Sequence, residues 1–361
     1  WQDFMFAGSF YPSDEDFLNN VKEEVKDQVD RLQNHPSIAL WCGNNEIHEA
    51  IVNWGYQKQF KYSKEDSLQV WKDYKKVFHE VIPNAINEFA TKDKSIYWES
   101  SPSIGWGHKE SLTEGDSHYW GVWWGNEDFE TFENKTGRFV SEYGMQAMPN
   151  YESVLKYTNQ EDRFLYSDIL KNHQKANNGF HKLDVYLKSY LIDSARLSKL
   201  SVEDYTYLTQ CVQYYGFKNM ILIHRSKSPY NMGTLLWQLN DCWPVASWSI
   251  TDYYNRAPKA AWYAVKNAYQ DVLTIERDTV KPKDLKLSNP NIKFRIEGNK
   301  IILKSSAFAK YVFVDVKSYK GRLSDNYFDL ESGIEKVITF DKTALNGEVE
   351  VKLKTLWDVT H

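Results

Sequence analysis

Two glutamates each follow a short apolar stretch, and each has a polar neighbour that could assist acid–base chemistry. Glu46 comes directly after Asn45, and Glu142 is followed by Tyr143. A carboxylic acid can give a proton to a leaving group, and an ionised carboxylate can attack carbon. A retaining glycosidase needs both functions from two carboxyl groups that lie about 5–5.5 Å apart. The pair is therefore a candidate for this chemistry.

Each glutamate taken alone has a simpler explanation. Glu46 could be an exposed residue that starts the next helix, and Glu142 could be a solvated residue at a strand end. Two acids at two similar strand ends are more informative than one, because a two-carboxylate reaction needs both. The hydroxyl of Tyr143 could also orient the second carboxylate.

The segments around these acids alternate between strand and helix patterns. We expect apolar strands at residues 3–10, 37–42, 95–98, 119–124, 138–141 and 233–239. We expect helices at residues 13–32, 63–81, 201–217 and 257–269. This alternation is typical of a parallel sheet. Polar residues recur where strands end, and no glycine-rich dinucleotide motif follows the first strand, so a (β/α) barrel is favoured over a Rossmann fold.

From about residue 270 the pattern changes to alternating apolar and polar residues. It is clearest at residues 291–307, 311–319 and 347–356, with Gly-Asn and Gly-Arg pairs at the expected turns. Such a pattern predicts antiparallel strands, and their number and spacing predict a small β-sandwich.

Composition narrows the function classes. The chain has 14 tryptophans and 24 tyrosines, which suit the stacking of sugar rings, although a large core with bulky packing would also use them. The net charge of −5 does not indicate a nucleic-acid surface. No apolar run reaches the ~18 residues of a membrane helix. The three cysteines indicate neither a disulfide framework nor a zinc site, and the histidines show no metal-ligand spacing.

Four stretches together resemble the β-mannosidases of glycoside hydrolase family 2: residues 37–46, 116–125, 138–144 and 233–254. The resemblance extends over nearly all of residues 1–270 and continues at residues 281–287 and 324–330. The Asn-Glu pair and the Ser-Glu-Tyr-Gly motif are shared with β-galactosidases and β-glucuronidases. Residues 118–123 and 237–245 are the stretches that point to mannosidases.

The resemblance implies a fold with two parts. Residues 1–270 would form a (β/α)8 TIM barrel, present from about its third strand onward, and residues 271–361 a small all-β, immunoglobulin-like sandwich. Two barrel strands and N-terminal β domains are then expected before residue 1. The family also places a β domain before the segment 281–287, whereas here residues 272–280 span that distance. Either a domain is deleted, or residues are missing from the numbering.

The resemblance also assigns roles to individual residues. Glu46 would be the acid/base, Glu142 the nucleophile and Asn45 the partner of the sugar 2-hydroxyl. Further substrate-binding positions would be Trp54, Trp124, Trp237, Asp241 and Trp243. Core packing is the alternative for each tryptophan. His118 and His108 are weaker candidates, because a structural, hydrogen-bonded histidine would explain them equally well.

The implied function is that of a retaining exo-β-mannosidase. It would hydrolyse terminal non-reducing β-D-mannose through a covalent mannosyl-enzyme, acting on a β-mannoside oligosaccharide or a glycoprotein glycan. The family resemblance also implies that no metal and no cofactor is required. A sister activity, β-galactosidase or β-glucuronidase, is one alternative, and a non-catalytic carbohydrate-binding fragment is another. A periplasmic, secreted or lysosomal location is expected rather than a cytoplasmic one. The sequon at residues 134–136 does not choose among these locations.

Overall fold

The computed structural model describes residues 1–91, 96–271, 280–317, 319–344, 347 and 349–361. It divides the chain into two compact units. Unit 1 comprises Trp1–Tyr119, Lys135–Glu142 and Tyr230–Gly233, and unit 2 comprises Trp120–Asn134, Tyr143–Pro229 and Thr234–His361. Among the described residues, no helix is both long enough and apolar enough to cross a membrane.

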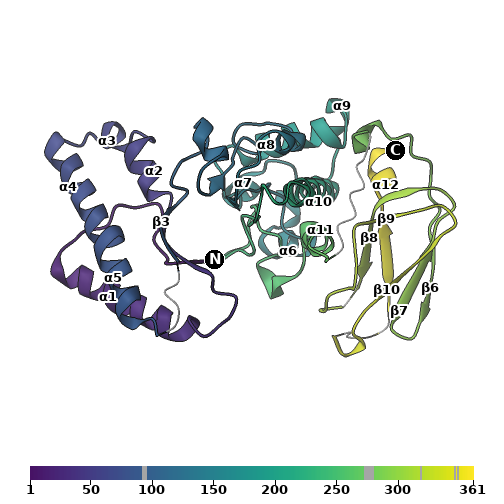
Figure 1. Ribbon diagram of the computed structural model, residues 1–361. Coiled ribbons are helices and arrows are strands. Elements are labelled where there is room, and N and C mark those ends of the chain that lie inside the picture. Colours follow the sequence, from purple (N-terminus) through teal and green to yellow (C-terminus); the bar gives the residue numbers. More distant parts are fainter. Residues whose placement is uncertain (92–95, 272–279, 318, 345–346, 348) are drawn as a thin grey trace. The chain divides into compact units, whose positions relative to one another are not determined.

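Two helices of unit 1 begin with side-chain caps, but the first helix, expected to start with the Ser13 hydroxyl as its cap, is capped by Asp14 instead. In α1 (Glu15–Leu32) the Asp14 side chain accepts the N–H of Phe17 at 3.0 Å. In α4 (Lys64–Lys75) Ser63 and Asp66 form a reciprocal capping box. After α4 the chain passes through a π-helical turn, η1 (Lys76–Val81), into α5 (Ile82–Phe89). Figure 1 shows α5 lying beside α1.

Two short parallel sheets of unit 1 position the acids. The first has the order β1 (Gln2–Asp3), β2 (Leu40–Asn45), β3 (Ile96–Ser101), and the second pairs β4 (Ser117–His118) with β5 (Val140–Glu142). Two short helices follow β2, α2 (Ile47–Val52) and α3 (Tyr56–Gln59).

The predicted strand at residues 37–42 is displaced in the structure. β2 continues through Asn45, because Asn44 and Asn45 pair with Ser100 and Ser101 of β3. Gly43 lies in the middle of this strand, where a Cβ atom would collide with the Tyr97 hydroxyl. The asparagines therefore belong to the strand, and only Glu46 lies beyond its end.

Three other strand predictions also need correction. The predicted strand at residues 3–10 is reduced to β1, which ends at Asp3. Residues 121–125 form a turn instead of a strand, and Trp123 there has a left-handed φ of 74°. Residues 233–239 form no regular strand, because they make single backbone bonds such as Trp237 N–H to Tyr143 C=O (2.8 Å) in place of a ladder.

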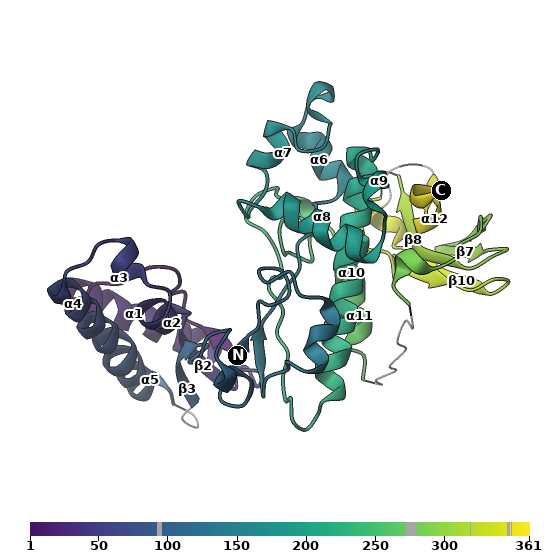
Figure 2. The ribbon, with the colours of Figure 1, turned by 90° about the horizontal axis from the view of Figure 1, so that it is seen from above.

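Unit 2 is organised around one long buried helix, α10 (Val202–Ser226), which extends well beyond the predicted end at residue 217. Helix α11 (Ala260–Ala268) packs along it, as both views show (Figures 1 and 2). The other α-helices of this region are α6 (Tyr151–Tyr157), α7 (Asp168–Asn172), α8 (Gly179–Tyr190) and α9 (Ser194–Leu197).

The C-terminal part consists of antiparallel sheets, which confirms the predicted pattern. One sheet contains β6 (Lys293–Glu297), β7 (Lys300–Lys304) and β10 (Glu335–Thr339) in the order β10-β7-β6. The other contains β8 (Ala309–Val316), β9 (Phe328–Leu330) and β11 (Val351–Lys354) in the order β11-β8-β9. Apolar side chains of both sheets share one core, and α12 (Leu356–Thr360) ends the chain.

Parallel strands and intervening helices in unit 1 agree with the predicted alternation, and a closed barrel remains a prediction. The expected division of the chain at residue 270 also remains a prediction. The expectation of a shortened connection concerns residues 272–280, of which 272–279 lie outside the described residues.

Candidate active site

Glu46 lies between β2 and α2 in an unusual backbone conformation. Its φ is 61°, a left-handed value that is uncommon for residues other than glycine. Its N–H donates to the Ser101 carbonyl (2.8 Å), and its carbonyl accepts the N–H of Ala50 (2.9 Å). Glu46 does occupy the N-cap of α2, but its side chain makes no capping hydrogen bond. The conformation costs about 1–3 kcal/mol, which is a reason to look for a functional role.

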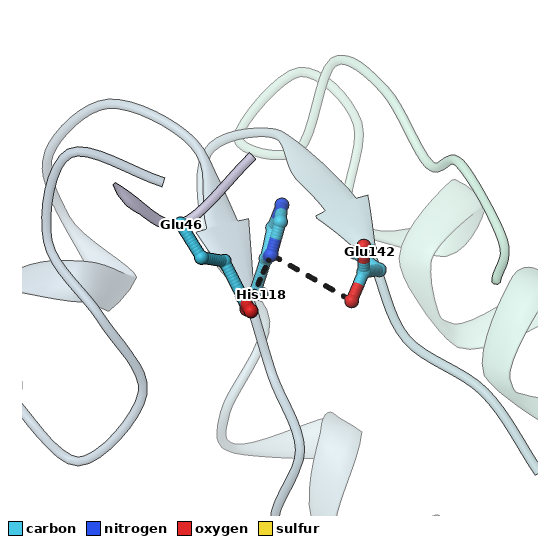
Figure 3. A group of neighbouring side chains, drawn as sticks. All are labelled: Glu46, His118 and Glu142. Carbon is cyan, nitrogen blue, oxygen red and sulfur yellow. Dashed lines mark hydrogen bonds and ion pairs between the residues drawn. The ribbon is translucent and has the colours of Figure 1, made fainter. Parts of the chain in front are cut away.

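The Glu46 carboxylate instead approaches His118, which lies between the two acids (Figure 3). The His118 Nδ1 atom is 2.9 Å from Oε1 of Glu46 and 3.7 Å from Oε1 of Glu142. One atom from each of the three side chains lies within 4.8 Å of the others. The structure therefore brings the two sequence-predicted acids together around a histidine.

Backbone pairing explains how Glu142 reaches this place. His118 of β4 pairs in parallel with Glu142 of β5, and the N–H of Tyr119 donates to the Glu142 carbonyl (3.2 Å). Glu46, His118 and Glu142 all lie at or just beyond the carboxyl ends of parallel strands, where barrel enzymes hold their reacting groups.

A buried polar network supports His118 on its other side. Its Nε2 atom is 2.9 Å from the Ser101 hydroxyl oxygen, and that hydroxyl donates to Asp116 Oδ2 (2.6 Å). Asp116 also accepts hydrogen bonds from the Ser141 hydroxyl and from the Trp98 indole N–H (2.9 Å). The sequence alone does not predict this network, whose only local signal is that Asp116 and His118 are two residues apart.

Burial and the neighbouring charges act in opposite directions on His118. Burial disfavours the imidazolium and lowers the pKa of His118. The charge of Glu142 and the hydrogen bond and charge of Glu46 outweigh burial, and they raise this pKa from 6.5 to about 9. At neutral pH the ring is therefore a cation that faces both carboxylates.

The same three side chains offer a nitrogen and two oxygens, a donor set that metals such as zinc use. The Nδ1 atom of His118 is hydrogen-bonded to the Glu46 carboxyl group, and we interpret the cluster as an acid–base centre.

Two further predicted site residues belong to unit 1. The Asn45 side chain is partly exposed next to Glu46, whereas that of Asn44 is buried and donates to the Glu99 carbonyl (2.8 Å). Trp54 is 43% exposed, and its ring lies 5.6 Å from that of Tyr56. Trp54 is thus not a core residue, and a sugar contact by Asn45 remains a prediction.

The remaining predicted residues belong to unit 2, beginning with Trp124 and Trp237. Trp124 is 43% exposed, and its ring lies 5.9 Å from that of Trp248. Lys182, which is buried, holds this turn by donating to the Trp123 and Trp124 carbonyls at 2.9 Å each. Trp237 is 40% exposed. Neither predicted tryptophan is a core residue, and their place in a sugar pocket remains a prediction.

Asp241 and Trp243 have partners of their own in unit 2. The Asp241 carboxylate is buried, forms an ion pair with Lys175 (3.2 Å) and accepts the Ser247 hydroxyl. The Trp243 ring lies 5.4 Å from the His173 ring. A direct sugar contact by Asp241 or Trp243 remains a prediction.

Tyr143 does not show the arrangement that the sequence suggested. Its buried hydroxyl accepts a hydrogen bond from the Thr234 hydroxyl (2.9 Å). The Glu142 carboxylate lies 3.7 Å from His118 Nδ1.

Comparison with known proteins identifies relatives with consistent names. Beta-mannosidase B from Aspergillus clavatus is 34% identical over 278 residues, which cover 73% of this chain and 31% of the relative. The enzyme of the same name from Aspergillus niger is 33% identical over 285 residues, which cover 75% and 32%. This chain is similar to a C-terminal part of the β-mannosidases of glycoside hydrolase family 2. It spans about a third of the length of these curated relatives.

Two further comparisons fit this family. The crystal structure of a β-D-mannosidase from Dictyoglomus thermophilum is 28% identical with a TM-score of 0.62, covering 98% of this chain and 41% of that one. An Ig-fold domain model named for mannosidases matches residues 287–359. An exo-chitosanase from Amycolatopsis orientalis has a TM-score of 0.59 at 12% identity, covering 96% of this chain and 54% of that one, and supports the fold alone.

Proposed function

We propose that this family 2 chain carries the catalytic pair of a retaining exo-β-mannosidase, with Glu46 as acid/base and Glu142 as nucleophile. The observation that carries the proposal is the meeting of these two carboxylates around His118, with one atom of each within 4.8 Å. Inverting enzymes hold their carboxyl groups about 6.5–9.5 Å apart to admit water, so the short separation favours retention. The substrate would be a terminal β-D-mannose of an oligosaccharide or a glycoprotein glycan.

The first half of the reaction would form a covalent intermediate. Glu46 would give its proton to the oxygen that links mannose to the leaving group. Glu142 would attack the anomeric carbon, so that one carbon–oxygen bond breaks and another forms. The partly exposed Asn45 beside Glu46 would contact the sugar 2-hydroxyl, where contacts strengthen in the transition state.

In the second half, Glu46 would act as a base. It would take a proton from water while the water oxygen attacks the anomeric carbon and releases Glu142. The exposed Trp54, Trp124 and Trp237, together with Trp243, would supply aromatic surface for the sugar, and Asp241 a polar contact. We also propose that residues 1–270 form part of a (β/α)8 barrel and residues 271–361 the sandwich domain.

We expect the full-length protein to hydrolyse an aryl β-mannoside at least ~10-fold faster than the matching β-galactoside and β-glucuronide, a difference within the range that direct sugar contacts provide. Release of the chromophore from the three substrates under identical conditions measures this preference. Turnover of the galactoside or the glucuronide with an inert mannoside would instead support a sister activity. A protein that binds mannosides but turns over none of the three would be a carbohydrate-binding fragment.

A further inference from the structure

A general acid must carry a proton when the substrate arrives, and glutamate is poorly suited to this at neutral pH. An unperturbed glutamate has a pKa of about 4.3, so at pH 7 it has lost its proton. The Glu46 side chain is partly exposed, and among its described contacts the nearest titratable nitrogen is His118 Nδ1, at 2.9 Å. His118 is therefore the residue to consider as the source of the Glu46 proton.

The network behind His118 determines which of its nitrogens can exchange that proton. Asp116, when ionised, can only accept hydrogen bonds, so the single Ser101 hydroxyl proton must point to Asp116. The Ser101 oxygen then has to accept from His118 Nε2, and this nitrogen must keep its hydrogen. Trp98 and Ser141 donate to the same carboxylate and help to fix this direction.

With Nε2–H fixed, the only variable proton of the ring is at Nδ1, which faces Glu46. Two arrangements satisfy the hydrogen bond of 2.9 Å: an imidazolium that donates to a Glu46 carboxylate, or a neutral ring that accepts from a Glu46 carboxylic acid. Both contain the same single proton. We propose that His118 stores the proton that Glu46 delivers to the leaving group, so that the Asp116–Ser101–His118 network serves as the proton reserve of the catalytic centre.

The protons balance over one catalytic cycle. Before reaction, the Nδ1 proton passes to Glu46 and the ring becomes neutral while it keeps Nε2–H. Glu46 gives that proton to the leaving oxygen as Glu142 bonds to the anomeric carbon. In the second half, water gives a proton to Glu46 and its hydroxyl to the sugar, and the proton returns to Nδ1. This inference rests on the proposed function, because it assigns the supply of a proton to Glu46.

The charges around His118 support a reserve that persists above neutral pH. The acidic groups that act on the ring are Glu46 and Glu142 on one side and Asp116 behind Ser101. Although burial opposes the cation, the charge of Glu142 and the contact with Glu46 raise the pKa of His118 to about 9. His118 therefore holds the stored proton below about pH 8 and loses it as the pH rises through 9.

The test uses two substitutions that each preserve one hydrogen bond of the ring. His118→Asn keeps an N–H near the Nδ1 position, and His118→Gln keeps one near the Nε2 position, but neither amide can release a proton. With a poor leaving group, the alkaline limb of kcat/KM should move to lower pH by at least ~1 unit in both variants, and kcat/KM at pH 7 should fall ~10- to 100-fold. With dinitrophenyl β-mannoside, which needs no proton, the loss should stay within ~3-fold.

His79→Asn is the matched control, because His79 forms a similar contact with Glu99 (2.7 Å) but is partly exposed. Its pH profile should equal that of the wild type. Ser101→Ala removes the hydrogen-bond acceptor of His118 Nε2. The alkaline limb of kcat/KM should then move to lower pH, by less than in the His118 variants. This variant tests the proposal even if the His118 variants unfold.

The proposal would be overturned if the folded His118→Asn variant kept the alkaline limb of the wild type. It would also be overturned if kcat/KM fell equally for the poor and the dinitrophenyl leaving group. Failure of the proposed function would give a different result, because the wild-type protein itself would then hydrolyse neither of the two mannosides.

Discussion

Replacing Glu142 by glutamine is expected to lower kcat for an aryl β-mannoside at least ~10⁴-fold, since loss of a covalent nucleophile removes the reaction path itself. The amide has nearly the size of the carboxylate and can still lie 3.7 Å from His118 Nδ1, so the fold should be retained. Steady-state kinetics together with thermal unfolding separates loss of chemistry from loss of structure.

Azide provides the chemical control for this position. Glu142→Ala leaves space on the face from which the nucleophile attacks, and azide entering there should give the α-mannosyl azide. Glu110→Gln, at an exposed glutamate of the same unit, should retain wild-type kinetics. A Glu142→Gln enzyme within ~10-fold of the wild-type rate would exclude Glu142 as the nucleophile.

Replacing Glu46 by alanine should affect substrates according to their leaving groups. Poor leaving groups need the proton, so glycosylation should slow ~10²- to 10⁴-fold, whereas a dinitrophenyl leaving group departs without it. A series of aryl β-mannosides of increasing leaving-group pKa measures this directly. The slope of log kcat/KM against that pKa should become much steeper than in the wild type.

Azide again distinguishes the role. In Glu46→Ala it can replace the base-activated water in the second half of the reaction, and the product should be the β-mannosyl azide. Equal losses across the leaving-group series, with no effect of azide, would indicate that Glu46 has only a structural role.

Local sequence rules predicted the parts of the fold that local interactions determine. Ser63 caps α4 as expected, α1 starts one residue after the expected Ser13 cap, at Asp14, and the alternating residues after 290 form antiparallel strands. Residues 119–124 and 233–239 look like strands because they are apolar and aromatic. Their backbone groups form isolated hydrogen bonds instead of a strand ladder. In the 121–125 turn, for example, two backbone carbonyls accept hydrogen bonds from the Lys182 ammonium group.

The candidate site shows the same limit. Glu46 and Glu142 could be singled out because each ends an apolar stretch and because the surrounding motifs resemble a known family. The reserve behind them joins Ser101, Asp116 and His118, whose contacts exist only once β3 and β4 are assembled. Sequence patterns indicate which face of a strand a residue occupies but not which partner it meets across strands, so the role of His118 required the structure.

The most direct test of the central claim is to trap the covalent intermediate. The full-length protein is incubated with 2-deoxy-2-fluoro-β-mannosyl fluoride, whose fluorine slows the second step more than the first, and the labelled peptide is sequenced by mass spectrometry. The account predicts one fluoromannosyl group per active site, attached to the side chain of Glu142. A label on any other residue would contradict it. Turnover of the reagent without inactivation and without any label on the protein would also contradict it.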